Sequence, residues 1–218
     1  EKKNHEQEQE LNQERLRFYT NITHELRTPL TLILGPLEDM QKETSLPAKQ
    51  AQKLSVIHQS ALRLLNLINQ ILEFRKTETQ NKKLCVSKGN IAPLIYEIGL
   101  KYKELNQKTK IDFQIQIEKE EMFLFFDKEI ITIVLDNLIS NAIKYTEQGR
   151  VTLSLYQTMR NEVAYTEIKV SDTGYGISAE ALPHIFDRYY QESGKHQASG
   201  TGIGLALVKN LVTLHEGE

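Results

Sequence analysis

The sequence predicts a mixed α+β protein in which a long helical hairpin precedes a domain of alternating helices and strands. The first 80 residues contain one glycine and are rich in Glu, Gln, Lys, Arg and Leu, which favour helices. Beyond residue 110, several short segments alternate apolar and polar residues with the period of two that strands show. All 11 glycines lie at or after Gly35, and seven of them fall between Gly174 and Gly217.

Two apolar stripes predict two helices in the first third of the chain. The first stripe, with spacings of seven and four residues, comprises Leu11, Phe18, Ile22, Leu26 and Ile33. A break follows at 44–47, where Pro47 suits the start of a second helix. The second stripe comprises Leu54, Ile57, Ala61, Leu64, Leu65, Ile68, Ile71 and Leu72. Two helices bury too little apolar surface alone, so we expect a dimer that forms a four-helix bundle.

The pattern changes after a polar stretch at 76–83, which is the expected linker. Alternating segments predict strands at 110–117, 122–126, 150–157 and 163–170. Helical segments are expected between and after them, at 91–106, 127–145 and 201–215. Strands interleaved with helices predict an α/β or α+β domain.

The composition argues against several classes of protein. Lys+Arg 27 against Asp+Glu 29 gives a net charge of -2, which does not favour nucleic acid or an acidic membrane. The single cysteine, Cys85, cannot form an internal disulfide or build a cysteine metal site. No apolar run approaches the roughly 18 residues of a membrane-spanning helix. The first ten residues are too polar for a signal peptide.

The first predicted helix carries a histidine with the neighbours that a nucleophile needs. His24 is followed by Glu25, and Thr28 lies one helical turn after His24 on the same face. A neutral imidazole has a nitrogen lone pair for attack, and a carboxylate beside it can hold the tautomer or accept a proton. A threonine one turn away can orient a water molecule. An ordinary surface histidine beside a glutamate fits the same pattern.

The segment DNLISNAIKYT at 136–146 places Asn137 and Asn141 on one helix face, with Lys144 three residues further on. Amide oxygens beside an ammonium group suit a hydrated Mg²⁺ ion and phosphate. A solvated helix face with ordinary asparagines is the alternative interpretation.

Two glycine-rich segments follow. SDTGYGIS at 171–178 comes directly after a predicted strand, and Asp172 is placed to accept a hydrogen bond from a base. SGTGIGLALV at 199–208 opens a helix whose N-terminal amides can bind phosphate. Arg188 lies between the two segments, where it can reach a γ-phosphate or form an ordinary exposed ion pair.

In this order, the motifs HELRTP, NLISNAIKYT, DTGYGIS, IFDRYYQ and GTGIGLAL resemble those of the sensor histidine kinases of two-component systems, including hybrid sensors. The resemblance covers residues 18–218. It implies a coiled-coil linker at 1–17, a HisKA dimerisation and phosphotransfer hairpin at 18–76, a linker at 77–83 and a HATPase_c domain at 84–218. That domain has the Bergerat fold, an α/β sandwich. The family continues with a strand hairpin and a glycine motif, so we expect the domain to be truncated at its C-terminus.

The resemblance also implies a role for each motif residue. His24 matches the phospho-accepting histidine, Glu25 its acid–base helper and Thr28 the residue that positions water for dephosphorylation. Asn141 matches the Mg²⁺ ligand, and Arg188 a catalytic residue near the γ-phosphate. The positions that match the ATP-binding residues are Asn137, Lys144, Tyr145, Asp172, Gly174, Gly176, Phe186, Gly200, Thr201, Gly202 and Gly204.

The implied activity is autophosphorylation of His24 by ATP and Mg²⁺, with transfer of the phosphoryl group to a response-regulator aspartate and phosphatase activity toward that regulator. The implied partners are a second copy, a receiver domain and an upstream sensor domain, with no direct contact to nucleic acid. The implied location is the cytoplasmic portion of an inner-membrane sensor. Two alternatives stay open: a different Bergerat-fold ATPase, such as a chaperone or DNA-repair clamp, and a non-catalytic dimerisation and binding module.

Overall fold

The structure is a computed structural model that describes residues 2–42, 47–78, 82–106, 110–191 and 202–218. Within its helices, the side chains of residues 2–20, 24 and 78 lie outside that description. The chain forms two compact units, residues 1–82 and 83–218. None of the described helices is both long enough and apolar enough to cross a membrane.

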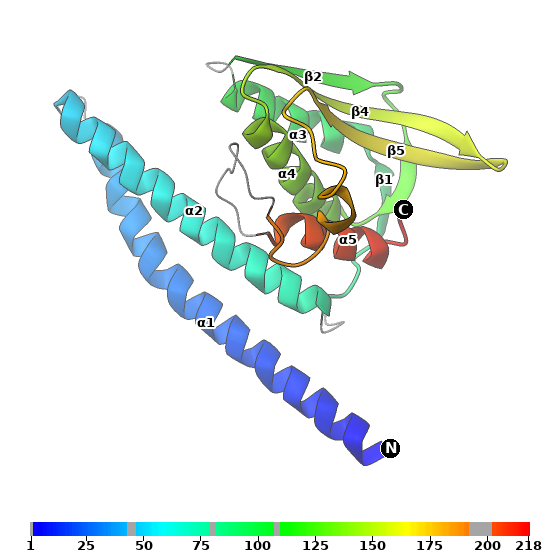
Figure 1. Cartoon of the computed structure of the whole chain (residues 1–218), viewed down its shortest axis with the longest axis horizontal. Helices are drawn as coiled ribbons and strands as arrows, with labels where there is room; N and C mark the ends of the chain where they lie inside the picture. Colours follow the sequence, from blue (N-terminus) through cyan, green and yellow to red (C-terminus); the bar gives the residue numbers. More distant parts are fainter. Residues whose placement is uncertain (1, 43–46, 79–81, 107–109, 192–201) are drawn as a thin grey trace. The chain divides into compact units, whose positions relative to one another are not determined.

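The first unit is a hairpin of two long helices, α1 (Lys2–Lys42) and α2 (Ala48–Glu78), which lie side by side (Figure 1). At a rise of 1.5 Å per residue they are about 62 Å and about 47 Å long. The helix α2 begins directly after Pro47, whose carbonyl accepts the amides of Gln50 and Ala51 at 2.8 and 3.0 Å. The predicted helix start at Pro47 is therefore correct.

The face that the two helices bury against each other coincides only in part with the predicted stripes. Leu54, Ala61, Ile68 and Leu72 of the second stripe are buried, whereas Leu26 and Ile33 of the first stripe are 48% and 49% exposed. The other buried apolar residues of the hairpin are Leu30, Leu34, Leu37 and Phe74. Each helix has two apolar faces, and periodicity does not show which of them meets the neighbouring helix.

The second apolar face is exposed in the single chain and repeats every seven residues. Seven residues make about two helical turns, so such residues lie in a line along the helix. The exposed residues of this face are Leu26, Ile33 and Met40 on α1, and Ile57, Leu64 and Ile71 on α2. Each helix therefore presents an apolar line that the hairpin itself does not cover.

The second unit combines five strands and three α-helices among its described residues. Its elements are β1 (Ser87–Asn90), α3 (Ala92–Leu105), β2 (Ile111–Ile117), β3 (Phe123–Phe126), α4 (Lys128–Tyr145), β4 (Gly149–Arg160), β5 (Val163–Asp172), the short 3₁₀ helix η1 (Leu182–His184) and α5 (Gly204–Leu214). The sequence did not predict β1, because SKGN lacks apolar alternation and forms a strand only by pairing with β3. The other strands and helices lie where their patterns predicted them, within a few residues.

Strands β2, β4 and β5 form one sheet with β4 in the centre, parallel to β2 and antiparallel to β5. The helices α3 and α4 cover one face of this sheet (Figure 1). Buried side chains from that face form the core; Phe113, Val151 and Leu153 are examples. The fold class is thus a helical hairpin followed by an α/β sandwich.

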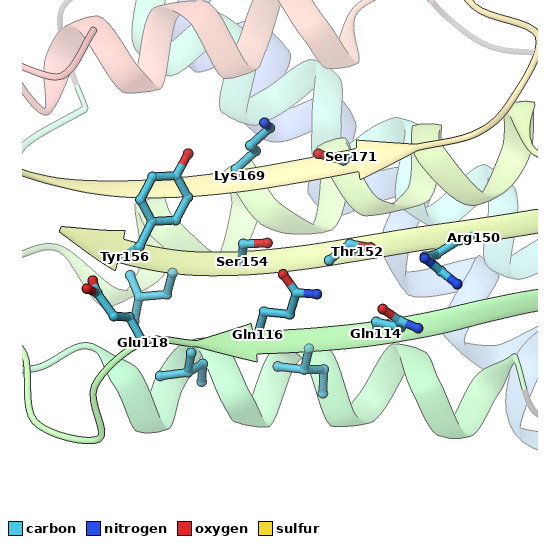
Figure 2. Close-up of a pocket in the computed structure, with 12 residues that line it drawn as sticks. Gln114, Gln116, Glu118, Arg150, Thr152, Ser154, Tyr156, Lys169 and Ser171 are labelled. Atoms are coloured by element: carbon cyan, nitrogen blue, oxygen red, sulfur yellow. The ribbon is translucent and has the colours of Figure 1, made fainter. Parts of the chain in front are cut away.

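The opposite face of the sheet is polar. Gln114 and Gln116 on β2 lie beside Thr152 and Ser154 on β4, with Lys169 on β5 (Figure 2). These side chains line an open hollow of about 720 Å³. The sheet therefore separates an apolar, helix-covered face from a polar one, and the strand register decides on which face each side chain lies.

An ion-pair cluster ties the segment after α2 back to the helix. Glu73 accepts hydrogen bonds from Lys76 at 2.7 Å and from Lys82 at 3.0 Å. Burial alone would raise the pKa of Glu73, but the hydrogen bonds and charges of the two lysines outweigh burial and hold the pKa below its usual value. The Lys82 amide also donates to the Lys76 carbonyl at 3.1 Å.

We expect Glu73→Gln to lower the free energy of unfolding by about 1 kcal/mol at pH 7. A carboxyl whose pKa is lowered on folding stabilises the protein above its unfolded-state pKa of about 4.3, and this stability is lost as pH falls through the folded-state value. The difference between the two proteins should therefore disappear on acidification. Urea titrations from pH 7 to pH 3 measure it, with Glu97→Gln, an exposed glutamate on α3, as the control. A difference that persists at pH 3 would contradict this assignment.

Candidate functional site

The middle of α4 lies against the start of α5. Asn137 and Asn141 are half-buried on α4, one turn apart. The Asn137 amide nitrogen donates to the Ile133 carbonyl at 2.8 Å, which orients the side chain along its own helix. A Cβ atom built on Gly204 would lie 2.8 Å from Oδ1 of Asn137. Because a side chain at this position would collide with the amide, glycine allows the α5 backbone to approach α4 this closely.

The loop that follows β5 packs against the C-terminal end of α4. The Tyr175 amide donates to the Tyr145 carbonyl at 3.2 Å, and a Cβ atom on Gly174 would collide with the same carbonyl. Lys144 lies beside Tyr145, with its Nζ 3.1 Å from the phenol oxygen and 4.6 Å from the ring centre. The predicted residues of α4 and of the first glycine segment are therefore neighbours in the structure.

Asp172 lies at the end of β5 on the helix-covered side of the sheet. Its register partner is Val151, which is fully buried in the core on that side. Oδ1 of Asp172 accepts the Gly174 amide at 2.9 Å, a turn that fixes the exposed carboxylate. This turn leaves the second carboxylate oxygen for other donors. Gly176, two residues further on, has φ +76°, a conformation that favours glycine.

Tyr175 joins this loop to the segment after α4. Its hydroxyl donates to Oε2 of Glu147 at 2.7 Å. This hydrogen bond to a carboxylate raises the pKa of Tyr175, because the phenolate would face a negative charge. Neither residue was predicted to belong to the site, because the two partners are 28 positions apart in the sequence.

The segment that carries Phe186 and Arg188 contacts the second glycine segment. The Tyr189 amide donates to the Gly202 carbonyl at 2.9 Å. Gly202 has φ +68°, and a Cβ atom on it would lie 2.6 Å from the Tyr189 backbone. Phe186 and Arg188 are exposed, and Lys209 of α5 lies with its Nζ 5.7 Å from the Phe186 ring centre. Gly200 and Thr201 lie outside the described residues.

Part of the predicted set thus lies on or against α4, on the helix side of the sheet: Asn137, Asn141, Lys144, Tyr145, Asp172, Gly174 and Gly204. Phe186 and Gly202 instead have contacts with α5 and with the Tyr189 segment. The hollow on the polar face is a different place, because none of its lining residues belongs to the predicted set (Figure 2). Ser171 lines that hollow, whereas Asp172, the next residue, lies on the other side of the strand. The strand alternation therefore keeps the two surfaces separate.

The donor set of the site suits a hydrated cation held together with phosphate. Among the described residues, no group of three or more His, Cys, Asp or Glu side chains is arranged to hold a metal ion. The oxygen donors offered by α4 are the amides of Asn137 and Asn141, which fit Mg²⁺ that keeps most of its water and phosphate ligands. Thr146, just beyond α4, has a buried Oγ1 with no hydrogen-bond partner among the described residues. No pattern in the sequence indicated this polar atom.

In the first unit, the backbone of His24 lies within α1, while its side chain is outside the described residues. Glu25 and Thr28 are exposed on the same helix. Arg27 of this segment donates to Oδ1 of Asn69 at 2.6 Å and so joins it to α2. On α2, Nε2 of His58 lies 3.7 Å from a carboxylate oxygen of Glu38 on α1.

Family models match both units. The model of the His Kinase A (phospho-acceptor) domain matches residues 14–80. The model of the histidine kinase-, DNA gyrase B-, and HSP90-like ATPase matches residues 126–218. This chain belongs to the sensor histidine kinases. The order of the two domains in these kinases agrees with the order of the motifs along the sequence.

Individual sensor kinases resemble the chain over nearly all of its length. Histidine kinase P4 of Formosa agariphila is 38% identical over 215 residues, which is 96% of this chain and 15% of that protein. The sensor histidine kinase WalK of Bacillus subtilis is 31% identical over 216 residues, 97% of this chain and 35% of that protein. The crystal structure of full-length ShkA in complex with AMPPNP has a TM-score of 0.70 and 25% identity, covering 91% of this chain and 41% of that one. The chain therefore spans well under half the length of these relatives.

Gly204→Ala tests the contact between the two helices of the site. The added methyl group would meet Oδ1 of Asn137 and push α5 away from α4, so we expect affinity for the ATP analogue AMPPNP to fall about tenfold. Isothermal titration calorimetry with Mg²⁺ measures this. Gly35→Ala is the matched control, because a Cβ atom there meets nothing within 4 Å. Equal affinities for the two variants would contradict the importance of this contact.

Proposed function

We propose that this chain is the kinase core of a signalling protein that phosphorylates its own His24 with ATP and passes the phosphoryl group to an aspartate of a response-regulator receiver domain. One observation carries the proposal. The chain carries two units, and each matches the corresponding kinase domain. The first is a helical hairpin with the motif HELRT, and in the second Gly204 packs on the Asn137 amide. We assign residues 1–17 to a coiled-coil linker, 18–76 to phosphotransfer, 77–83 to a linker and 84–218 to ATP binding.

In the proposed reaction, a ring nitrogen of His24 attacks the γ-phosphorus of ATP in line with the leaving oxygen. The P–O bond to the β-phosphate breaks, ADP leaves, and Glu25 accepts the proton that the imidazole loses. Such transfers depend mainly on positioning and charge neutralisation. Arg188, which is exposed, is the cation assigned to the γ-phosphate. Thr28 is assigned to orient the water that removes the phosphoryl group from the regulator.

We assign different parts of the nucleotide to different residues of the site. Asp172 would read the base with the carboxylate oxygen that its turn does not use. Lys144 and Asn137 face the phosphates, together with the amides at the start of α5 after Gly204. Asn141 would hold Mg²⁺, which supplies neutralising charge to the phosphate oxygens when it is bound.

The exposed apolar lines on α1 and α2 support a homodimer. Leu26, Ile33, Ile57 and Leu64 are all large, apolar and exposed in the single chain. A second hairpin with the same lines would bury them in a four-helix bundle. We further propose that the N-terminal coiled coil receives the signal from an upstream sensor domain, and that the chain is the cytoplasmic portion of an inner-membrane sensor.

Leu64→Glu tests the dimer. The substitution would bury an unpaired carboxylate at the expected interface, so we expect the dissociation constant of the dimer to rise about 100-fold. Sedimentation equilibrium measures it. Gln59→Glu, which introduces the same charge at an exposed polar position of α2, should leave the dimer intact. A dimer that survives Leu64→Glu would contradict this interface.

His24→Ala tests the phosphoryl acceptor. The chain incubated with γ-labelled ATP and Mg²⁺ should acquire label that is lost in acid, because a phosphoramidate bond hydrolyses at low pH. We expect His24→Ala to remove this label completely and His58→Ala, the matched histidine on α2, to retain it. Label lost equally in both variants would contradict the assignment of His24.

The same assay separates the two alternative functions. Release of inorganic phosphate without labelled protein would indicate an ATPase of the wider Bergerat-fold group. Absence of nucleotide binding would indicate a non-catalytic dimerisation and binding module.

A further inference from the structure

The C-terminal end of α5 is fixed by a turn that places His215 at the helix cap. The Gly217 amide donates to the Val212 carbonyl at 2.9 Å, and the Glu216 amide donates to the Thr213 carbonyl at 3.1 Å. Glu216 has φ +57°, the left-handed conformation that ends many helices. This hydrogen-bond pattern holds the backbone of His215 in one place.

From this place, His215 accepts a hydrogen bond from the start of α4. The Asp127 amide donates to Nε2 of His215 at 3.0 Å, so this nitrogen carries no proton and the ring proton is on Nδ1. Asp127 is 2% exposed, and its carboxylate accepts the amides of Glu129 and Ile130 at 3.0 and 3.1 Å and that of Cys85 at 2.7 Å. One residue thus joins the start of the second unit, the first turn of α4 and the end of α5.

The same two helices touch again at Gly204 and Asn137, where a Cβ atom on the glycine would lie 2.8 Å from the amide oxygen. Asp127 and Asn137 are ten residues apart, and Gly204 and His215 are eleven residues apart. At 1.5 Å per residue, these separations are about 15 Å and about 16 Å. Because the start of α4 meets the end of α5 and the middle of α4 meets the start of α5, the two helices run antiparallel. The matching lengths place the two contacts at opposite ends of one interface.

We propose that His215 is a positioning residue for nucleotide binding. By accepting the Asp127 amide, it fixes the far end of α5, so that Gly204 at the near end stays against Asn137. Without an acceptor, the buried amide would need water, and the end of α5 would have to move to admit it. The role of His215 in nucleotide binding rests on the proposed function, whereas its role in holding α5 against α4 does not.

Two conservative variants distinguish the role of the side chain as a hydrogen-bond acceptor from the effect of its size. In His215→Gln, Oε1 reaches about as far as Nε2, so it can still accept the Asp127 amide. In His215→Asn, Oδ1 extends only as far as Nδ1 and cannot reach that amide. Thr213→Asn places the same new side chain at an exposed position of the last turn and is the control.

Amide hydrogen exchange of the chain without nucleotide tests the helix contact. We expect His215→Asn to speed exchange about tenfold at 129–133 of α4 and at 207–210 of α5, because both helices lose a shared anchor. His215→Gln and Thr213→Asn should match the wild type within about twofold. Faster exchange confined to 211–217, or equal effects of His215→Gln and His215→Asn, would overturn the proposal.

Calorimetric titration with AMPPNP and Mg²⁺ tests the consequence for the site. We expect His215→Asn to weaken binding about tenfold and His215→Gln to bind within about threefold of the wild type. Unchanged affinity in His215→Asn would overturn the positioning role. No binding by the wild type would overturn the nucleotide part together with the proposed function, and the exchange result would still decide the helix contact.

Discussion

The close approach of α5 to α4 is the constraint on which the second unit depends. At one end, glycine at 204 leaves the Asn137 amide in place, because a Cβ atom there would lie 2.8 Å from its Oδ1. At the other end of the interface, His215 is the acceptor for a buried amide. With both ends fixed, the helix that follows the second glycine segment lies beside the helix that carries the proposed Mg²⁺ ligand, Asn141.

The strand register is the second constraint, because it assigns polar groups to one face or the other. Along β5, Ser171 lines the open polar face (Figure 2). Asp172, whose register partner Val151 is buried, lies on the side of the helices. A one-residue slip would exchange them and move the carboxylate that is proposed to read the base to the other face of the sheet. The hollow on the polar face is therefore separate from the proposed ATP site, although both lie on the same three strands.

Local patterns were enough to predict much of this structure. Asn137 and Asn141 are four residues apart in the sequence, which places them one turn apart on the helix. The first glycine segment follows a strand that the alternation predicted. Contacts between distant segments could not be predicted in this way: His215 and the Asp127 amide are 88 positions apart. Apolar spacing likewise identified the helical hairpin but not its buried face, since Ile33 belongs to the second apolar face. The roles assigned to individual site residues stay predictions.

We propose that ATP binds on the helix side of the sheet, around α4. Amide chemical-shift mapping of the isotope-labelled chain during titration with AMPPNP and Mg²⁺ locates the binding site. We expect the largest shifts at 137–145, 172–176 and 202–208. Largest shifts at 114–118 and 154–156, on the strands that line the polar hollow, would contradict it, as would the absence of any shift.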